Sequence, residues 1–148
     1  MVCIYCGSTT QVTNSRHQKR ANFVWRRRKC LNCQAVITSI EKPELITSLV
    51  VTKKDGHIEP FYEEKLFVSV LKSLEHRKNY TVQARSLTDT ALTKLIQRIK
   101  RPQLTTSEIA QVVSDVLKHY DLAALVKYSS FQRQLSAQRD IKKLTKNT

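Results

Sequence analysis

The chain has 148 residues, enough for one ordinary domain or for a small metal-stabilised domain followed by a compact second one. Its hydrophobic fraction of 41% is adequate for a buried core and excludes a disordered chain, and no apolar segment approaches the length of a membrane span. Lysine and arginine outnumber aspartate and glutamate by 26 to 12, a net charge of +14, so we expect a polyanionic partner, with nucleic acid first and nucleotides or an acidic membrane surface next.

All four cysteines lie in two C-x-x-C pairs, Cys3 with Cys6 and Cys30 with Cys33. A two-residue gap lets both thiolates of a pair bind one tetrahedral ion from a tight turn, and two such turns complete a structural zinc site. Two disulfides or a redox-active pair are the alternatives. The N-terminal residues are mostly polar and lack the apolar segment of a signal peptide, so we expect a cytoplasmic protein, in which reduced thiols favour metal. The sequence therefore predicts one Zn²⁺ per chain.

The segment around these cysteines predicts a small antiparallel sheet. Residues 9–14 and 23–28 are rich in β-branched and aromatic side chains, a polar connection covers residues 17–22, and a third short strand is indicated at residues 36–40. We expect a three-stranded zinc ribbon over residues 1–42. Because so small a sheet cannot fold without its ion, removal of zinc should unfold it.

The region between the cysteine pairs is strongly basic, and no acidic residue occurs among the first 40. Its seven cationic residues are Arg16, Lys19, Arg20, Arg26, Arg27, Arg28 and Lys29. Neighbouring side chains on a strand point to opposite faces, so Arg26 and Arg28 would share one face and Arg27 would lie on the other, with Trp25. We expect Arg16 and the three consecutive arginines to contact phosphates and base edges of nucleic acid. The alternative is a solvated surface that offsets the negative charge of a four-thiolate zinc centre.

Residues 41–44 break the strand pattern and mark the best domain boundary. Beyond them, residues 49–52 and 57–61 are predicted strands joined by Lys53-Lys54-Asp55-Gly56, since Asp-Gly between two apolar runs is the strongest short hairpin signal. The adjacent lysines suit a polyphosphate, and Glu59 can accept hydrogen bonds from a sugar or base. Ordinary surface lysines are the alternative.

Four amphipathic helices are expected after the hairpin. The first is indicated by an apolar stripe over residues 63–76, and the second by a Thr81 cap and an end at Pro102. The third opens with a Thr105-x-x-Glu108 capping box, and the fourth starts after Asp121 and runs to about Leu135. Lys65 lies in the first helical turn, where a cation is disfavoured unless it is solvated or faces a ligand phosphate. A hairpin followed by four helices predicts a compact α+β domain or a hairpin-capped bundle, and a basic tail follows at residues 137–148.

No catalytic pattern stands out in the sequence. The four histidines are scattered, no G-x-x-x-x-G-K-[ST] loop occurs, and two glycines exclude a glycine-rich phosphate cradle. We therefore expect a protein that is not an enzyme, and hydrolysis of a nucleotide is the least favoured hypothesis.

Three motifs together resemble a known family. The segments Cys3-x-x-Cys6-Gly7, Asn14-Ser15-Arg16 and Arg26-Arg27-Arg28-Lys29-Cys30 resemble the zinc ribbon of the NrdR transcriptional repressors. Val51-Thr52-Lys53-Lys54-Asp55-Gly56-x-x-Glu59-Pro60-Phe61-x-x-Glu64-Lys65-Leu66 resembles the opening of the ATP-cone, a domain that this family shares with ribonucleotide reductases. Residues 125–133 are similar to the last helix of that cone.

The resemblance implies an α+β chain with a three-stranded zinc ribbon over residues 1–42 and an ATP-cone, a β-hairpin plus a four-helix bundle, over residues 46–136. It implies a repressor that senses ATP and dATP, assembles into homo-oligomers and binds double-stranded DNA upstream of ribonucleotide reductase genes. By matching position, the nucleotide-binding residues would be Val51, Lys53, Lys54, Glu59 and Lys65, and the DNA-binding residues Arg16, Arg26, Arg27 and Arg28.

The chain departs from the family pattern at several of these positions. Lys54 replaces an arginine, which removes a bidentate phosphate contact and keeps the charge. Tyr62 replaces an aspartate that could cap the first helix, and Lys127 and Gln132 replace an arginine and a tyrosine. The alternative function is a zinc-ribbon module that binds nucleic acid or a ribosomal or polymerase partner, with a degenerate cone that senses no nucleotide.

Overall fold

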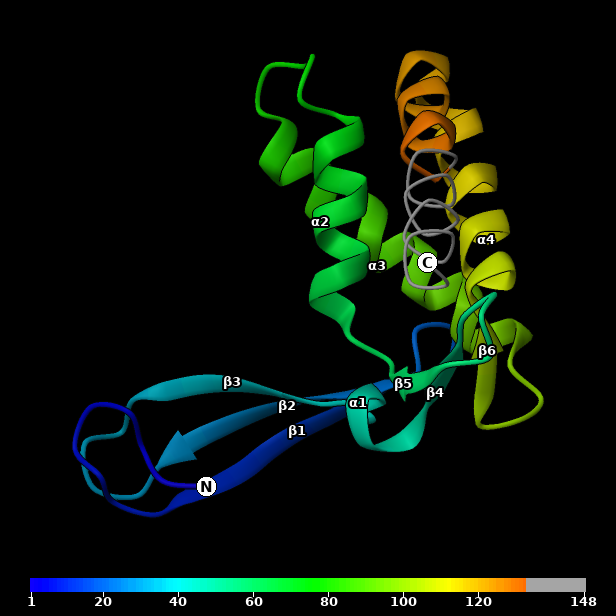
Figure 1. Cartoon of the computed structure of the whole chain (residues 1–148). Helices are drawn as coiled ribbons and strands as arrows, with labels where there is room; N and C mark the ends of the chain where they lie inside the picture. The colour runs from blue at the N-terminus through cyan, green and yellow to red at the C-terminus, as the bar shows by residue number, and fades with distance from the viewer. Residues whose placement is uncertain (133–148) are drawn as a thin grey trace, which may run out of the picture. The chain divides into compact units, whose positions relative to one another are not determined.

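The computed structural model describes residues 1–132, and the chain divides into two compact units, Met1–Glu44 and a second one that begins at Leu45. The expected end of the last helix near Leu135 and the basic tail at residues 137–148 lie outside the described residues. Each unit has its own sheet, and all the described helices belong to the second unit (Figure 1).

The first unit is a three-stranded antiparallel sheet in the order β1-β2-β3 (Figure 1). Its strands are β1 (Thr10–Gln18), β2 (Phe23–Cys30) and β3 (Val36–Glu41). The predicted strands are confirmed, but β1 runs four residues further than expected, so the connection to β2 is shorter. A bulge in β1 between Val12 and Asn14 shifts the register and places Asn14 opposite Arg27.

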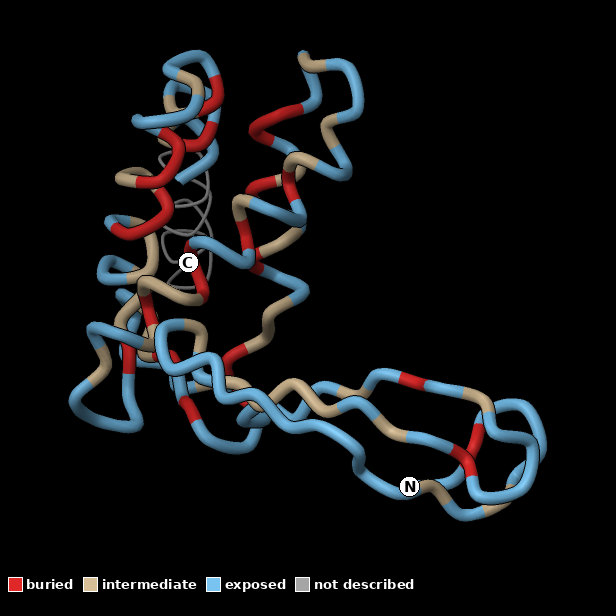
Figure 2. Tube along the Cα trace, turned by 180° about the vertical axis from the view of Figure 1, so that it is seen from behind, coloured by how far each residue is buried: buried red, intermediate tan, exposed pale blue. Residues whose placement is uncertain are grey.

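The ribbon buries very little apolar surface. Its buried hydrophobic residues are Cys3, Cys30 and Ile37, which lie at the cysteine end of the sheet, and the rest of the trace is largely exposed (Figure 2). A sheet with so small a core depends on a cross-link or a metal for its stability.

The second unit contains the predicted hairpin and one strand that the sequence did not reveal. Strands β4 (Val50–Thr52) and β5 (Ile58–Pro60) pair antiparallel, and β6 (Gln103–Thr105) pairs parallel with β4 to give the order β5-β4-β6. A four-residue helix, α1 (Leu45–Ser48), precedes β4 and was not predicted either.

The helices of the second unit are α2 (Glu63–Ser73), α3 (Tyr80–Arg98), α4 (Thr106–Tyr120) and a last helix over residues 122–132. The predicted Thr81 cap is wrong. The N-cap of α3 is Asn79, whose φ of 56° is left-handed and whose side chain makes no capping bond. The capping box of α4 is confirmed, because the Glu108 N–H donates to Thr105 Oγ1 at 3.1 Å and the Thr105 N–H donates to Glu108 Oε2 at 2.6 Å.

The core of the second unit lies between its helices and its small sheet (Figure 2). It includes Val51 of β4, Phe61, Leu104 of β6, and Ala124 and Tyr128 of the last helix. The sheet and the last helix therefore share one core with α2, α3 and α4, and the expected α+β fold is confirmed.

Asp121 joins the start of the last helix to the connection between α2 and α3. Its Oδ1 accepts the backbone N–H groups of Ala123 and Ala124 at 2.8 and 3.2 Å, as an N-cap does, and its Oδ2 lies 2.8 Å from Arg77 Nη1 and 3.0 Å from His76 Nε2. The Arg77 hydrogen bond, with that of His76, holds the pKa of Asp121 well below its ordinary value. This carboxylate thus fixes one end of the helix that carries Tyr128.

Candidate functional sites

The four cysteines form the first candidate site, and the two C-x-x-C turns bring them together at the end of the ribbon. Their Sγ atoms all lie within 4.8 Å of one another, with 3.7 Å between Cys3 and Cys33 and 3.5 Å between Cys6 and Cys30. A tetrahedral zinc ion with bonds of about 2.3 Å separates its sulfur ligands by about 3.8 Å. All four cysteines are free thiols, so the donor set fits a closed four-sulfur metal site.

Local hydrogen bonds favour the thiolate form of Cys6 and Cys3. The backbone N–H of Ser8, with the Ser8 hydroxyl, lowers the pKa of Cys6 to about 6, and the backbone N–H of Tyr5 lowers the pKa of Cys3. At Cys33 the backbone hydrogen bond from Ala35 also favours the thiolate, but the neighbouring sulfurs of Cys6 and Cys30 outweigh it and raise the pKa of Cys33 to about 12. The N–H of Asn32 donates to Cys30 Sγ at 3.4 Å. Because adjacent thiolates repel one another, a bound cation would offset the repulsion and hold all four sulfurs deprotonated.

The second candidate site is a cavity of about 260 Å³ in the second unit. Val51, Lys53, Glu59 and Lys65 all line it, so the fold brings together four of the five residues that the resemblance assigned to nucleotide. Lys54 is exposed at the hairpin tip and is not among the lining residues. At the wall of the cavity the Lys65 side chain is 59% exposed to solvent.

Two lysines and one carboxylate set the charge of this cavity. Glu59 Oε2 accepts from Lys53 Nζ at 2.7 Å and from Lys65 Nζ at 3.0 Å. The hydrogen bond from Lys53, with that from Lys65, lowers the pKa of Glu59, so the carboxylate is charged and the trio carries one net positive charge. Lys65 Nζ also lies 4.5 Å from the centre of the Tyr62 ring, a cation–π contact. An anionic ligand can therefore recruit two ammonium groups that are already positioned.

Other residues of the cavity wall were not assigned from the sequence. Thr106 and Ile109 come from the first turns of α4, and Tyr128 and Gln132 come from the last helix. Burial raises the pKa of Tyr128 to about 12, so its phenol is neutral. All four residues lie far beyond the hairpin in the chain, and the motif at residues 125–133 was the one signal that pointed towards Tyr128 and Gln132.

The third candidate site is the set of arginines on the ribbon, which have unequal surroundings. Arg26 forms an ion pair with Glu41 at 2.8 Å, and Arg28 Nε donates to Ser39 Oγ at 3.0 Å. The guanidinium of Arg16 lies 5.8 Å from the centre of the Trp25 ring, while Arg27 is exposed. The structure thus gives different surroundings to four residues that were all expected from the sequence to contact DNA.

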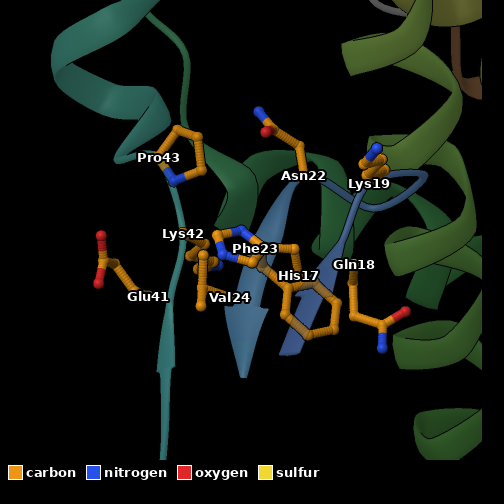
Figure 3. A pocket seen from close by; sticks show the side chains of 9 residues that line it. All are labelled: His17, Gln18, Lys19, Asn22, Phe23, Val24, Glu41, Lys42 and Pro43. Atoms are coloured by element: carbon orange, nitrogen blue, oxygen red, sulfur yellow. The ribbon is translucent and has the colours of Figure 1, made fainter. Parts of the chain in front are cut away.

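A further hollow, of about 440 Å³, lies at the end of the ribbon away from the cysteines (Figure 3). It is lined by residues 17–19, 22–24 and 41–43, which come from the β1–β2 turn and from the chain that leaves β3. Most of these residues are exposed, so the hollow is an open depression beside the unit boundary.

Within residues 1–132, no helix combines the length and the apolar composition that a membrane span requires.

Comparison with known proteins covers both units. Residues 1–41 match the family described as "Transcriptional repressor NrdR-like, N-terminal domain", and residues 49–138 match the ATP cone domain. Proteins named "Transcriptional repressor NrdR" from Staphylococcus epidermidis and Petrotoga mobilis are each 33% identical over 90% of this chain, covering 85% and 89% of their own lengths. The one from Symbiobacterium thermophilum is 34% identical over 90% of this chain and 88% of its own. Both domain matches and the relatives agree with the resemblance noted in the sequence, and the chain therefore belongs to the NrdR family of transcriptional repressors.

Proposed function

We propose that this protein is a nucleotide-responsive transcriptional repressor. Its ribbon, held by one Zn²⁺ on Cys3, Cys6, Cys30 and Cys33, binds double-stranded promoter DNA, and its ATP-cone binds ATP or dATP as an effector. The observation that carries the proposal is the convergence of Lys53 and Lys65 on the cavity in a chain of this family.

In this proposal the cavity holds the nucleotide by its two chemically different ends. Lys53 and Lys65 neutralise phosphate oxygens, and Lys54 adds positive charge at the hairpin tip. Glu59 keeps the lysines together when no phosphate is present and accepts hydrogen bonds from the sugar or base. Val51, Ile109 and the neutral Tyr128 provide apolar surface for the adenosine.

The regulatory role follows from the family name of the relatives, which are transcriptional repressors. We propose that nucleotide changes the homo-oligomeric state of the cone, and that the oligomer sets the affinity of the ribbons for DNA upstream of ribonucleotide reductase genes. The protein would act in the cytoplasm and would bind its nucleotide without hydrolysing it.

The test is to release and identify any nucleotide that copurifies with the protein, and then to titrate the stripped protein with ATP and dATP by calorimetry. The proposal expects an adenine nucleotide bound with a Kd in the micromolar range or tighter, and no phosphate release. A zinc-loaded protein that binds neither nucleotide would instead be a ribbon module with a degenerate cone, and steady phosphate release would make it an enzyme.

A further inference from the structure

The ribbon sheet has two faces, and the strand register assigns each side chain to one of them. Residues that alternate along β2 share a face, and directly paired residues on neighbouring strands share it too. Trp25 pairs with Arg16 of β1 and Ile40 of β3, and Arg27 pairs with Asn14 and Thr38. We call the face with Arg16, Trp25, Arg27, Lys29, Thr38 and Ile40 the Trp25 face, and the opposite one, with Arg26, Arg28, Ser39 and Glu41, the Arg26 face.

The cations of the Arg26 face are engaged within the sheet. Two nitrogens of Arg26, Nη2 and Nε, approach Glu41 Oε2 at 2.8 and 3.2 Å. Arg28 donates to Ser39, and both arginines are half-buried. These contacts join β2 to β3, and Glu41 neutralises one of the two positive charges. The two arginines therefore hold the strands together and have little free charge for a polyanion.

The Trp25 face has the opposite character. Its cations, Arg16, Arg27 and Lys29, are exposed. None of the ribbon strands β1, β2 and β3 places a carboxylate beside them on this face. The Arg27 side chain makes no hydrogen bond or ion pair with another residue of the described chain, and Arg16 is oriented by its cation–π contact with Trp25. Ile40, 60% exposed on the same face, adds apolar surface among the charges.

We infer that the ribbon contacts the DNA duplex with its Trp25 face. Arg16, Arg27 and Lys29 bind phosphates there, whereas Arg26 and Arg28 act as positioning residues that hold β3 against β2. This assignment rests on the proposed function and differs from the sequence-based expectation that all three consecutive arginines contact DNA. Arg27 gives up no partner within the described sheet when it binds a phosphate.

Two charge-matched double variants test the assignment, since R27A/K29A and R26A/R28A each remove two positive charges. The full zinc-loaded chain is titrated against a fluorescein-labelled duplex of mixed sequence over a range of salt concentrations, where phosphate contacts dominate binding. The expected result for R27A/K29A is a loss of affinity of about tenfold or more, with a salt-dependence slope smaller by about 1.8, or about 0.9 for each lost phosphate contact. R26A/R28A should retain its slope.

Zinc content is measured for each variant. If R27A/K29A fails to hold the metal, the single variant R27A replaces it, and R26A likewise replaces R26A/R28A. The chain has one tryptophan, Trp25, so its emission reports directly on the proposed face. Unlabelled duplex should change Trp25 emission in the wild type and in R26A/R28A. Binding that depends on Arg26 and Arg28 but not on Arg27 and Lys29, with unchanged Trp25 emission, would overturn this inference alone. A wild-type protein that binds no duplex would overturn the proposed function together with it.

Discussion

Lys53 and Lys54 are neighbours in the chain, but the hairpin gives them different surroundings. Lys53 lines the cavity and donates to Glu59, with a side chain that is 23% exposed, whereas Lys54 lies at the exposed tip. Lys53 directly follows β4 and Lys54 lies in the turn, so the two adjacent side chains have different surroundings. The pair is expected to contribute unequally to nucleotide binding.

We predict that Lys53→Ala weakens ATP binding by about tenfold or more, because it removes an ammonium group that is already held at the cavity. Lys54→Ala should cost less, and Lys118→Ala, which removes an exposed charge at the end of α4, should leave the Kd unchanged. Calorimetric titration of the three variants measures this order. Equal affinities for K53A and wild type would argue against the cavity as the nucleotide site.

Asp121 provides a prediction about stability. Its Oδ2 faces Arg77 and His76, so Asp121→Asn should lower the free energy of unfolding by about 1–2 kcal/mol, chiefly through a weaker hydrogen bond to the charged Arg77. Asp89→Asn is the control, since Asp89 forms an exposed pair with Arg85 at 3.7 Å, and such pairs contribute little. Denaturation followed by far-UV circular dichroism reports on the second unit, which contains the described helices.

The lowered pKa of Asp121 gives this difference a definite dependence on pH. A carboxyl whose folded pKa is depressed stabilises the protein fully above its ordinary pKa of 3.8, and this contribution is lost as pH falls through the folded value. The difference in unfolding free energy between wild type and D121N should therefore be present above pH 3.8 and shrink as the pH falls below that value. A difference that grows as the pH falls below 3.8 would show that Asp121 is not held as a carboxylate.

At the scale of residues, the sequence predicted which kinds of side chain form the zinc site better than it predicted which distant residues contact one another. The C-x-x-C spacing required four sulfurs near one ion, and the structure brings them together. The partner of Arg26 was not predictable, because Glu41 lies 15 positions away and was assigned to a boundary segment. Thr106 and Tyr128 were missed for the same reason, since only the packing of α4 and the last helix against the hairpin brings them to the cavity.

At the scale of elements, long periodic segments were predictable and short ones were not. The apolar stripes of α2, α3 and α4 identified those helices, whereas β6 has three residues, too few for an alternating pattern to be recognised. β6 gains its strand conformation from parallel pairing with β4, a contact between residues about 50 positions apart. A chain that appeared to contain a simple hairpin therefore contains a three-stranded sheet.

The capping box of α4 begins at the last residue of β6 and fixes the helix that brings Thr106 and Ile109 to the cavity. We predict that Thr105→Ala lowers the free energy of unfolding by about 1 kcal/mol, because the Glu108 N–H loses its acceptor. Thr90→Ala, on the exposed surface of α3, should not destabilise the chain. Chemical denaturation compares the variants, and equal losses for both would mean that the cap contributes nothing specific.

At the scale of the whole molecule, the two units have cores of very different size. The second unit buries a continuous cluster of hydrophobic residues, while the ribbon buries Cys3, Cys30 and Ile37. Hydrophobic burial can therefore maintain the cone by itself, but the ribbon needs its metal. The order of the two units along the chain was recognisable from the sequence, because the C-x-x-C motifs of the ribbon and the hairpin motif of the cone each lie within one short segment.

Removal of zinc should consequently unfold one unit and spare the other. We predict that a chelator changes Trp25 emission and abolishes DNA binding, while the helical circular dichroism signal of the cone is retained. Cys33→Ser should reproduce this behaviour, because three thiolates and a hydroxyl bind zinc more weakly. Metal analysis should find one zinc per wild-type chain. Loss of the helical signal along with the metal would contradict the independence of the two cores.

The central claim is that nucleotide in the cone controls DNA binding by the ribbon. The most direct measurement is the affinity of the zinc-loaded, nucleotide-stripped protein for a labelled duplex from upstream of a ribonucleotide reductase gene, with no nucleotide, with ATP and with dATP. The account predicts affinities that differ by at least about tenfold between nucleotide states, a coupling free energy of about 1.4 kcal/mol, and no such difference in K53A. Equal DNA affinity in all three states, with nucleotide bound, would contradict it.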